Sequence, residues 1–339
     1  MHQGLTDYVS RAYSLPPIHE TNTVDKGFLS TNFILHTNTH QYFLKQYRFT
    51  TQEPVAAAHA AKHFFAARGI PVIVPLQNGA GHTFFANDGR YYALFPYVDG
   101  DHLPRGSFSR RALQSTAALL AKLHRAGRNV TLPHVRIQQS QKSYANFVET
   151  AHQILDKIPT QERTDFDELA IETIHLKLHL AAQNREAIAQ MGLPSDHLLH
   201  GDYQDSNFFF DEDEQISHLF DWEKTIIGPR GLELARAIEF ICFSNPHDYK
   251  ALFSDENFDQ AGHFLKTYHE SYPISLDEFA TTVHVRYLQK VLSLWVEADH
   301  YLENNTRVDP FLEAEYNTIQ YGSHALAEYI ERVYSMERF

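Results

Sequence analysis

The sequence predicts an α+β fold with two lobes, a small lobe built on an antiparallel sheet and a larger lobe that is mostly helical. Two apolar segments, 28–35 and 41–47, flank a turn-rich tip and indicate a strand hairpin near the N-terminus. Beyond residue 100, apolar residues recur mostly at helical spacing. A chain of 339 residues, 43% of them hydrophobic, is long enough for two lobes with a sizeable core.

Composition narrows the class of protein. A formal net charge of −13 argues against non-specific binding to nucleic acid or to anionic membranes. The one cysteine, Cys242, excludes an internal disulfide and any cysteine-rich zinc site. Neither an apolar span of membrane length nor a signal-peptide pattern is visible, so a cytoplasmic location is expected.

The small lobe is expected to combine strands with one helix. The first 20 residues form a polar, partly helical lead-in, and alternation in the segment 41–47 places Lys45 on one strand face with two aromatic residues. An alanine-rich helix over 55–68 is opened by hydroxyl, acidic and proline residues and ended by Gly69. Further strands are expected at 72–74 and 83–85, followed by a buried strand from Arg90 that runs into a linker at Gly100.

A second hairpin interrupts the helical pattern of the larger lobe. The aromatic run 208–210 and the apolar run 216–220 flank an acidic turn, and a short apolar run at 197–199 precedes them. The hairpin returns the chain to the end at which the preceding loop begins. Helices are expected on both sides of it, over 110–124, 144–158, 165–191, 232–244, 258–272, 276–304 and 309–336.

Three polar residues at fixed spacing accompany this hairpin. Asp202 follows His200-Gly201, Asn207 comes five residues later, and Asp221 ends the second strand. In phosphoryl-transfer enzymes an acid at the first position orients and deprotonates the acceptor hydroxyl, and the amide and second acid hold Mg²⁺ on the nucleotide phosphates. Asp and Asn are also common in ordinary turns, but three of them at this spacing, each beside an apolar strand, favour the functional interpretation.

The motif His-Gly-Asp-x-x-x-x-Asn, followed by a strand that ends in Phe-Asp-Trp-Glu, resembles the aminoglycoside phosphotransferase and choline kinase superfamily of small-molecule kinases. The resemblance covers most of residues 25–240. It implies a bilobal protein-kinase-like fold, with a nucleotide-binding lobe at 1–94, a hinge at 95–100 and a helical catalytic and acceptor-binding lobe at 101–339. It also implies ATP and Mg²⁺ as cofactors and a small molecule as acceptor, with no nucleic-acid or membrane partner.

The same resemblance implies roles for residues of the small lobe. Lys45 is expected to contact the α- and β-phosphates, because kinases place a lysine on the cleft-facing side of such a strand. In the usual arrangement a glutamate of the following helix pairs with this lysine. Here Ala58 stands at that position, so either Glu53 reaches Lys45 or the pair is missing. Further nucleotide contacts are expected from the phosphate hairpin and the hinge, at Ser30, Thr31, Asn32, Phe95 and Tyr97.

The acceptor is not specified by the motifs. If the carboxylates of Asp205, Glu223 and Glu239 converge beside the γ-phosphate, the pocket is acidic and favours an acceptor with an amine or several hydroxyls. Amino alcohols, homoserine-like amino acids, aminoglycosides and sugars all remain open. The alternatives are a protein Ser/Thr kinase of the same fold and a nucleotide-binding pseudokinase with a regulatory role.

Overall fold

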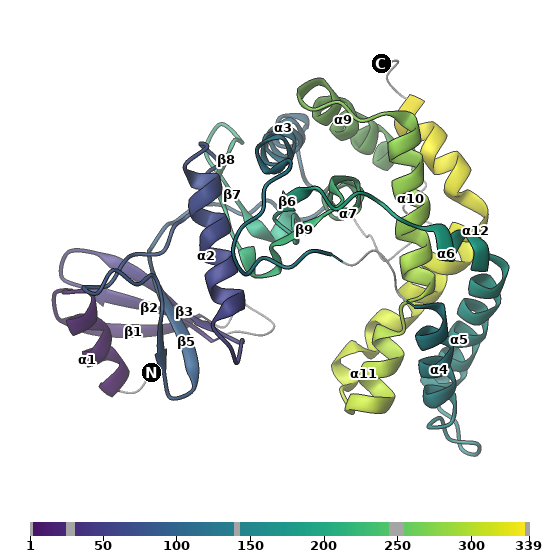
Figure 1. The fold of residues 1–339 in the computed structure, drawn as a ribbon, viewed down its shortest axis with the longest axis horizontal. Helices are drawn as coiled ribbons and strands as arrows, with labels where there is room; N and C mark the ends of the chain where they lie inside the picture. The colour runs from purple at the N-terminus through teal and green to yellow at the C-terminus, as the bar shows by residue number, and fades with distance from the viewer. Residues whose placement is uncertain (1–2, 25–30, 139–142, 244–253, 336–339) are drawn as a thin grey trace. The chain divides into compact units, whose positions relative to one another are not determined.

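The computed structural model describes residues 3–24, 31–138, 143–243 and 254–335 (Figure 1). Its contacts divide the chain into two compact units. The first, here called the sheet unit, comprises Met1–Leu103, Lys122–Ile137 and Asp196–Ile227, and the helical unit comprises Pro104–Ala121, Gln138–Ser195 and Gly228–Phe339. The α+β class and the small antiparallel sheet are confirmed. The second hairpin belongs to the same unit as the N-terminal sheet, and the expected lobe boundaries stay a prediction.

Five antiparallel strands form the main sheet, in the order β1-β2-β3-β5-β4 (Figure 1). The hairpin expected from the sequence is β2–β3, with Phe33 opposite Leu44. The strands are β1 (Ile18–Val24), β2 (Asn32–Thr37), β3 (Gln41–Tyr47), β4 (Phe85–Asn87) and β5 (Arg90–Pro96).

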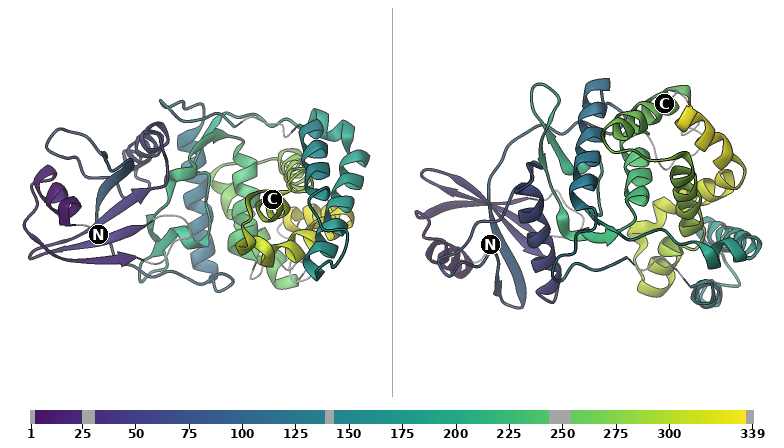
Figure 2. Two further views of the ribbon diagram at one scale, coloured as in Figure 1. Left: turned by 90° about the horizontal axis from the view of Figure 1, so that it is seen from below. Right: turned by 45° about the horizontal axis from the view of Figure 1, so that its top comes forward.

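Each face of the sheet is covered by one helix, because side chains alternate along every strand (Figures 1 and 2). Leu35 and Leu44 point to the face covered by Leu5 and Val9 of helix α1 (Gln3–Ala12). The opposite face, which also carries Lys45, is covered by helix α2 (Glu53–Ala66) through a cluster that includes Val55 of α2 and Tyr47, Ala93 and Phe95 of the sheet. The face of Lys45 therefore lies toward α2.

Two details of the small lobe differ from the sequence-based expectation. Strand β1 begins within the segment expected to be a lead-in and was not predicted. Its residues are polar and mostly exposed, as an edge strand permits, so the sequence gives little sign of it. The expected strand at 72–74 is reduced to a single bridge between Val72 and Leu219. At this bridge the backbone N–H of Leu219 donates to the carbonyl of Pro71 at 2.8 Å.

The second hairpin forms as expected and is followed by a short return strand. Strand β7 (Phe208–Phe210) pairs antiparallel with β8 (Ile216–Leu219), and β6 (His197–Leu199) pairs with β9 (Ile226–Gly228). Two single turns of 3₁₀ helix, η1 (Asp205–Asn207) and η2 (Trp222–Lys224), follow the loop of Asp202 and the hairpin, respectively. Helix α2 packs against η2, with the rings of Phe65 and Trp222 5.1 Å apart.

The helical unit is built on one large apolar cluster that draws on α4, α5, α10 and α12. Two long helices expected from the sequence are each divided, at Asn184 and at Leu292–Leu294.

Among the described residues no helix is long and apolar enough to cross a membrane. Helix α3 (Arg110–Gly127) has residues in both units. The helical unit further contains α4 (Tyr144–Leu155), α5 (Asp165–Gln183), α6 (Arg185–Gln190), α7 (Arg230–Cys242), α9 (Asp255–Ser271), α10 (Leu276–Val291), α11 (Trp295–Glu303), η3 (Thr306–Phe311) and α12 (Leu312–Ser335).

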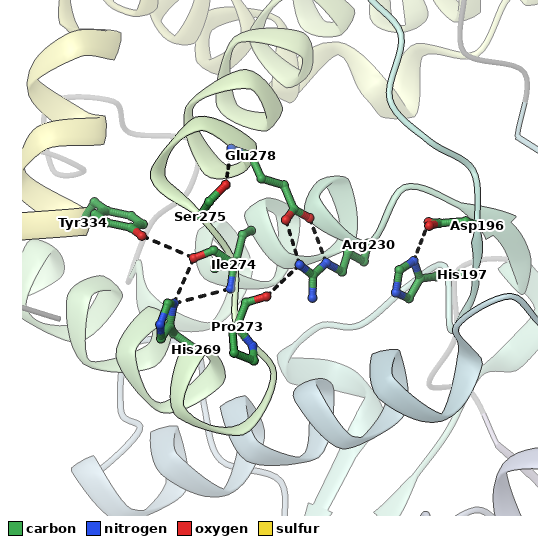
Figure 3. A network of polar contacts seen from close by, with 9 residues as sticks. All are labelled: Asp196, His197, Arg230, His269, Pro273, Ile274, Ser275, Glu278 and Tyr334. Atoms are coloured by element: carbon green, nitrogen blue, oxygen red, sulfur yellow. Dashed lines mark hydrogen bonds and ion pairs between the residues drawn. The ribbon is translucent and has the colours of Figure 1, made fainter.

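A polar network joins three of these helices (Figure 3). Arg230, at the start of α7, forms a two-point ion pair with Glu278 of α10, with N···O distances of 2.8 and 2.7 Å. The same guanidinium donates to the carbonyl of Pro273 at 2.8 Å, and the hydroxyl of Tyr334 on α12 donates to the neighbouring carbonyl of Ile274 at 3.3 Å. The network therefore fixes the turn between α9 and α10 and the start of α7.

Gly127 marks a close approach of two backbones in the sheet unit. A Cβ atom at this position would lie 2.2 Å from the carbonyl oxygen of Leu198 on β6. We expect Gly127→Ala to lower the free energy of unfolding by about 2 kcal/mol or more, because the backbone of β6 has to shift. Gly4→Ala is the matched control, since no atom lies within 4 Å of the added Cβ. Chemical denaturation of both variants measures the effect, and equal stabilities contradict the close approach.

Candidate active site

The loop after β6 is shaped by a glycine with a left-handed backbone. Gly201 has φ of +85°, and a Cβ there would lie 1.9 Å from the carbonyl oxygen of Lys224. Only glycine fits both the conformation and the contact. The loop that carries Asp202 is therefore pressed against η2, and the side chain of Asp202 is 4% exposed.

His200 joins the two segments that carry the expected active-site acids. Its Nδ1 accepts the backbone N–H of Asp202 at 3.2 Å, and its Nε2–H donates to the carbonyl of Phe220 at 2.5 Å. The ring is fully buried and packs edge-on against Trp222 at 4.6 Å. The histidine therefore positions Asp202 relative to the end of β8, where Asp221 follows.

Asn207 closes the loop from the other end. Its side-chain Nδ2 donates to the backbone carbonyl of Asp202 at 2.8 Å, and the backbone carbonyl of Asn207 accepts the N–H of Phe220 at 2.9 Å. With its amide nitrogen used in this way, the amide oxygen of Asn207 is the group left to act as a ligand. The loop, Asn207 and the hairpin therefore form one hydrogen-bonded assembly.

Asp221 lies at the end of β8 in a left-handed conformation, with φ of +51°, which Asp adopts more readily than most residues. Its Oδ1 is 3.2 Å from Nζ of Lys45 on β3. Burial acts to raise the pKa of Asp221, but the charge of Lys45 outweighs it and holds the pKa below its usual value. The sequence-predicted phosphate lysine and metal acid are therefore brought together, and Asp221 is ionised.

Lys45 has a second and closer acidic partner, Glu223. Burial opposes the charge of Lys45, but Asp221 and Glu223 together raise its pKa above the usual value. Glu223 also lies 3.9 Å from Nε of Arg48. The acid that pairs with the strand lysine therefore comes from η2 rather than from the helix, which sequence reasoning missed.

Helix α2 supplies no acid to this pair. Ala58, at the usual glutamate position, is buried, and Glu53 is an exposed first-turn residue. A hydrogen bond from Thr51 and its own backbone N–H lower the pKa of Glu53. Of the two possibilities that the sequence left open, the helix pair is missing, and Glu223 provides the negative charge in its place.

Lys224 is a second residue that the sequence motifs did not single out. Its Nζ lies 3.1 Å from Oδ2 of Asp202, and its side chain is half-exposed. The signal available in the sequence was its place directly after the Phe-Asp-Trp-Glu strand end. The ion pair therefore holds the carboxylate of Asp202 toward η2.

The remaining nucleotide-contact residues are only partly accounted for. Ser30 falls outside the described residues, and Thr31 is exposed. Asn32 is paired across the sheet with Lys45 and is buried. Phe95 is buried on the Lys45 face of β5, and Tyr97, just beyond β5, is half-buried. Their contacts with nucleotide stay predictions.

Two of the three carboxylates expected to make the acceptor pocket acidic are in ion pairs. Glu223 is paired with Lys45 and Arg48, and Glu239 on α7 is bound by Arg286 and Lys290 of α10. Burial acts to raise the pKa of Glu239, but these two cations lower it to about 2. Asp205 lies buried in η1. Because Glu223 and Glu239 are neutralised by cations of their own units, neither provides the charge on which that expectation depended.

The donor set of this site fits a divalent cation that also binds phosphate. Asn207 offers an amide oxygen and Asp221 an ionised carboxylate, which are ligands of the kind that Mg²⁺ accepts. Among the described residues no three His, Cys, Asp or Glu side chains are grouped to hold a metal by themselves. Mg²⁺ commonly takes one or two protein ligands and completes its shell with phosphate and water oxygens, so the two groups suffice.

Comparison with known proteins agrees with this geometry. Residues 20–274 match the phosphotransferase enzyme family. The chain belongs to this family. Within the phosphotransferase family it is similar to a homoserine kinase of Afipia carboxidovorans, 28% identical over 283 residues that cover 81% of this chain and 77% of that protein. The suspected superfamily of small-molecule kinases is thereby confirmed.

Solved structures of other phosphotransferases share the fold. A spectinomycin phosphotransferase in complex with ADP and spectinomycin matches with a TM-score of 0.65 at 14% identity, over 100% of this chain and 99% of its own. An amicoumacin kinase in complex with AMP-PNP and Ca²⁺ matches with a TM-score of 0.64 at 15% identity, over 92% of this chain and 93% of its own. At these identities the likeness shows the bilobal kinase-like fold alone.

The pairing of Lys45 with Glu223 predicts a stability effect. The two side chains are only 14% and 10% exposed, so Glu223→Gln leaves a buried ammonium with one acidic partner fewer. We expect the variant to lose about 2 kcal/mol of unfolding free energy, somewhat less than the ~3–5 kcal/mol typical of a fully buried pair. Glu53→Gln is the control and should leave the unfolding midpoint unchanged.

A double-mutant cycle with Lys45→Met separates the pair from its surroundings. Because the two side chains act together, the combined variant should be less destabilised than the sum of the single ones. Additive losses, or an equal effect of Glu53→Gln, contradict the assignment of Glu223 as the partner of Lys45.

Proposed function

We propose that this phosphotransferase is an ATP- and Mg²⁺-dependent kinase that transfers the γ-phosphoryl group to a hydroxyl of a small amine-bearing molecule, with homoserine as the first candidate. The observation that carries this proposal is the meeting of Lys45 and Asp221 beside a loop in which Asn207 binds the backbone of Asp202. Phosphoryl transfer requires a cation for the phosphates, ligands for a metal ion and a base. Lys45 would be the cation, Asn207 and Asp221 the ligands, and Asp202 the base.

Asp202 is the residue proposed to touch the acceptor. Its carboxylate accepts a hydrogen bond from the acceptor hydroxyl, orients the oxygen for in-line attack and takes its proton as the bond to the γ-phosphorus forms. The bond from the γ-phosphorus to the bridging oxygen breaks in the same step, and ADP leaves. The backbone of Asp202 is fixed by Asn207 and His200, so the carboxylate is held without help from the substrate. Such preorganisation accounts for much of the catalysis in a reaction with little covalent chemistry for the protein.

Lys45, Asn207 and Asp221 are proposed to bind the nucleotide. Mg²⁺, held by Asn207 and Asp221, would neutralise charge on the phosphates. Lys45 is kept cationic by its two acids, and its ammonium is a donor for the α- and β-phosphates. Glu223 limits the positions that this long side chain can take, which is the role that the helix acid has in the usual arrangement.

The similarity to a homoserine kinase supports an amino-acid acceptor. Homoserine carries a primary hydroxyl, an ammonium and a carboxylate. An acidic pocket would repel that carboxylate, but Glu223 and Glu239 are each neutralised by basic partners. The pairing of these two carboxylates supports a zwitterionic acceptor.

A transfer assay over a panel of acceptors tests the proposal. The protein is incubated with ATP and Mg²⁺ and with homoserine, an amino alcohol, an aminoglycoside, a neutral sugar and a hydroxy acid without an amine, and ADP and the phosphorylated product are both measured. We expect homoserine to be the best acceptor of the panel. A hydroxy acid without an amine as the best substrate contradicts the acceptor class, and no transfer to any compound contradicts the kinase function.

Replacement of the proposed base provides the matched variant. Asp202→Asn keeps the size of the side chain and removes its ability to accept a proton. Turnover should fall by about 10²-fold or more, while nucleotide affinity stays near that of the wild type. Near-normal turnover in the folded variant rules out Asp202 as the base, and a loss of nucleotide binding assigns it a structural role instead.

A further inference from the structure

Helix α2 carries a buried lysine whose charge the proposed function does not use. Lys62 is 7% exposed, and its Nζ lies 4.2 Å from the centre of the Phe95 ring on β5. Phe65, one turn further along α2, packs on Trp222 of η2. The side of α2 that carries Lys62 therefore lies between the Lys45 face of the sheet and the segment that follows Asp221.

Among the described residues, the ammonium of Lys62 has no hydrogen bond or ion pair. The nearest acids, Asp221 and Glu223, direct their oxygens to Lys45 instead. An ammonium that is removed from water without a carboxylate or carbonyl partner is costly, and contact with an aromatic face offsets only part of that cost. An anion close to this ammonium would offset that cost.

The position of Lys62 along α2 is informative. It lies four residues after Ala58, so the two share one face of the helix, and Ala58 stands where the family resemblance expects the glutamate that pairs with the strand lysine. In this chain the same helix face thus presents a cation in place of an anion. Since Glu223 already pairs with Lys45, the change leaves Lys45 with its acidic partner and adds a second positive charge nearby.

The electrostatic surroundings agree with a group that is poised for an anion. Burial, reinforced by the neighbouring charge of Lys45, lowers the pKa of Lys62 to about 7, although Asp221 and Glu223 act in the opposite direction. Across the sheet from Lys45, the side-chain oxygen of Asn32 is also buried and has no hydrogen-bond partner among the described residues. This oxygen only accepts hydrogen bonds, so an anion on this face has to be bound by the ammonium groups of Lys45 and Lys62.

We propose that Lys62 is a second phosphate-contacting residue, whose ammonium binds the phosphate chain of the nucleotide together with Lys45. The inference rests on the proposed function, because it takes the nucleotide phosphates as the missing anion. It extends that function by assigning to α2 a direct contact with the nucleotide, where the usual arrangement has an indirect one.

Calorimetric titration of the full-length protein with ADP and with adenosine, in Mg²⁺, tests this inference. Lys62→Met keeps the long apolar stem and removes the charge. Affinity for ADP should fall about 10-fold or more, as for the loss of a hydrogen bond to a charged group, while affinity for adenosine changes less than about twofold. Lys157→Met, which removes an exposed charge just beyond α4, is the matched control and should bind both ligands as the wild type does.

The unfolding midpoint of the nucleotide-free protein is the second readout. Because Lys62→Met removes a buried and unpaired charge, the midpoint should stay unchanged or rise, whereas removal of a packing residue would lower it. Lys62→Gln, which is polar but uncharged, repeats the titrations if the methionine variant does not fold.

The outcomes separate this inference from the proposed function. If Lys62→Met binds ADP as tightly as the wild type, or loses ADP and adenosine to the same extent, Lys62 does not contact phosphate and only fills the core. If the wild-type protein binds neither ligand, the proposed function fails, and the inference fails with it.

Discussion

The ion pairs of Lys45 with Asp221 and Glu223 are the interaction on which the rest of the site depends. They connect strand β3 to a segment 176 residues further along the chain, so no local pattern can replace them. They bring the carboxylate of Asp221 to the Lys45 face of the sheet. The pairs cost desolvation, and they persist because each cation is matched by an acid in good geometry.

The surrounding structure holds the acids where these pairs require them. Gly201 allows the loop of Asp202 to lie against the backbone of Lys224, and His200 bonds both to that loop and to the end of β8. The contact between Phe65 and Trp222 fixes η2 on α2. Apolar packing and hydrogen bonds to the backbone therefore position the loop of Asp202 and η2, and the ion pairs with Lys45 form between groups that are already close.

Much of this arrangement could be predicted from the sequence, because its signals are short-range. Asp202, Asn207 and Asp221 lie on one loop and one hairpin, so their spacing determines their proximity. Strand alternation identified the face of Lys45, and β3 confirms it. Strand β1 was missed because an edge strand carries little hydrophobic signal.

The ion-pair partners that the sequence did not reveal are distant along the chain. Glu223 was expected at the acceptor, yet it binds Lys45, and Glu239 binds Arg286, 47 residues away on another helix. Nothing in the spacing of an acid reveals which cation it meets after folding. A missing helix glutamate is an argument for a non-catalytic protein, and that argument weakens because Glu223 pairs with Lys45 in its place.

Nucleotide titration with and without Mg²⁺, in the wild type and in Asp221→Ala, tests most directly whether the group of residues around Lys45 is a nucleotide phosphate site. Carboxylate is the stronger ligand for a hard cation than an amide. The wild type should bind ADP more tightly when Mg²⁺ is present, and Asp221→Ala should lose most of that gain while it retains metal-independent binding. If both proteins show the same dependence on Mg²⁺, Asp221 is a structural partner of Lys45 and the account of the site is wrong.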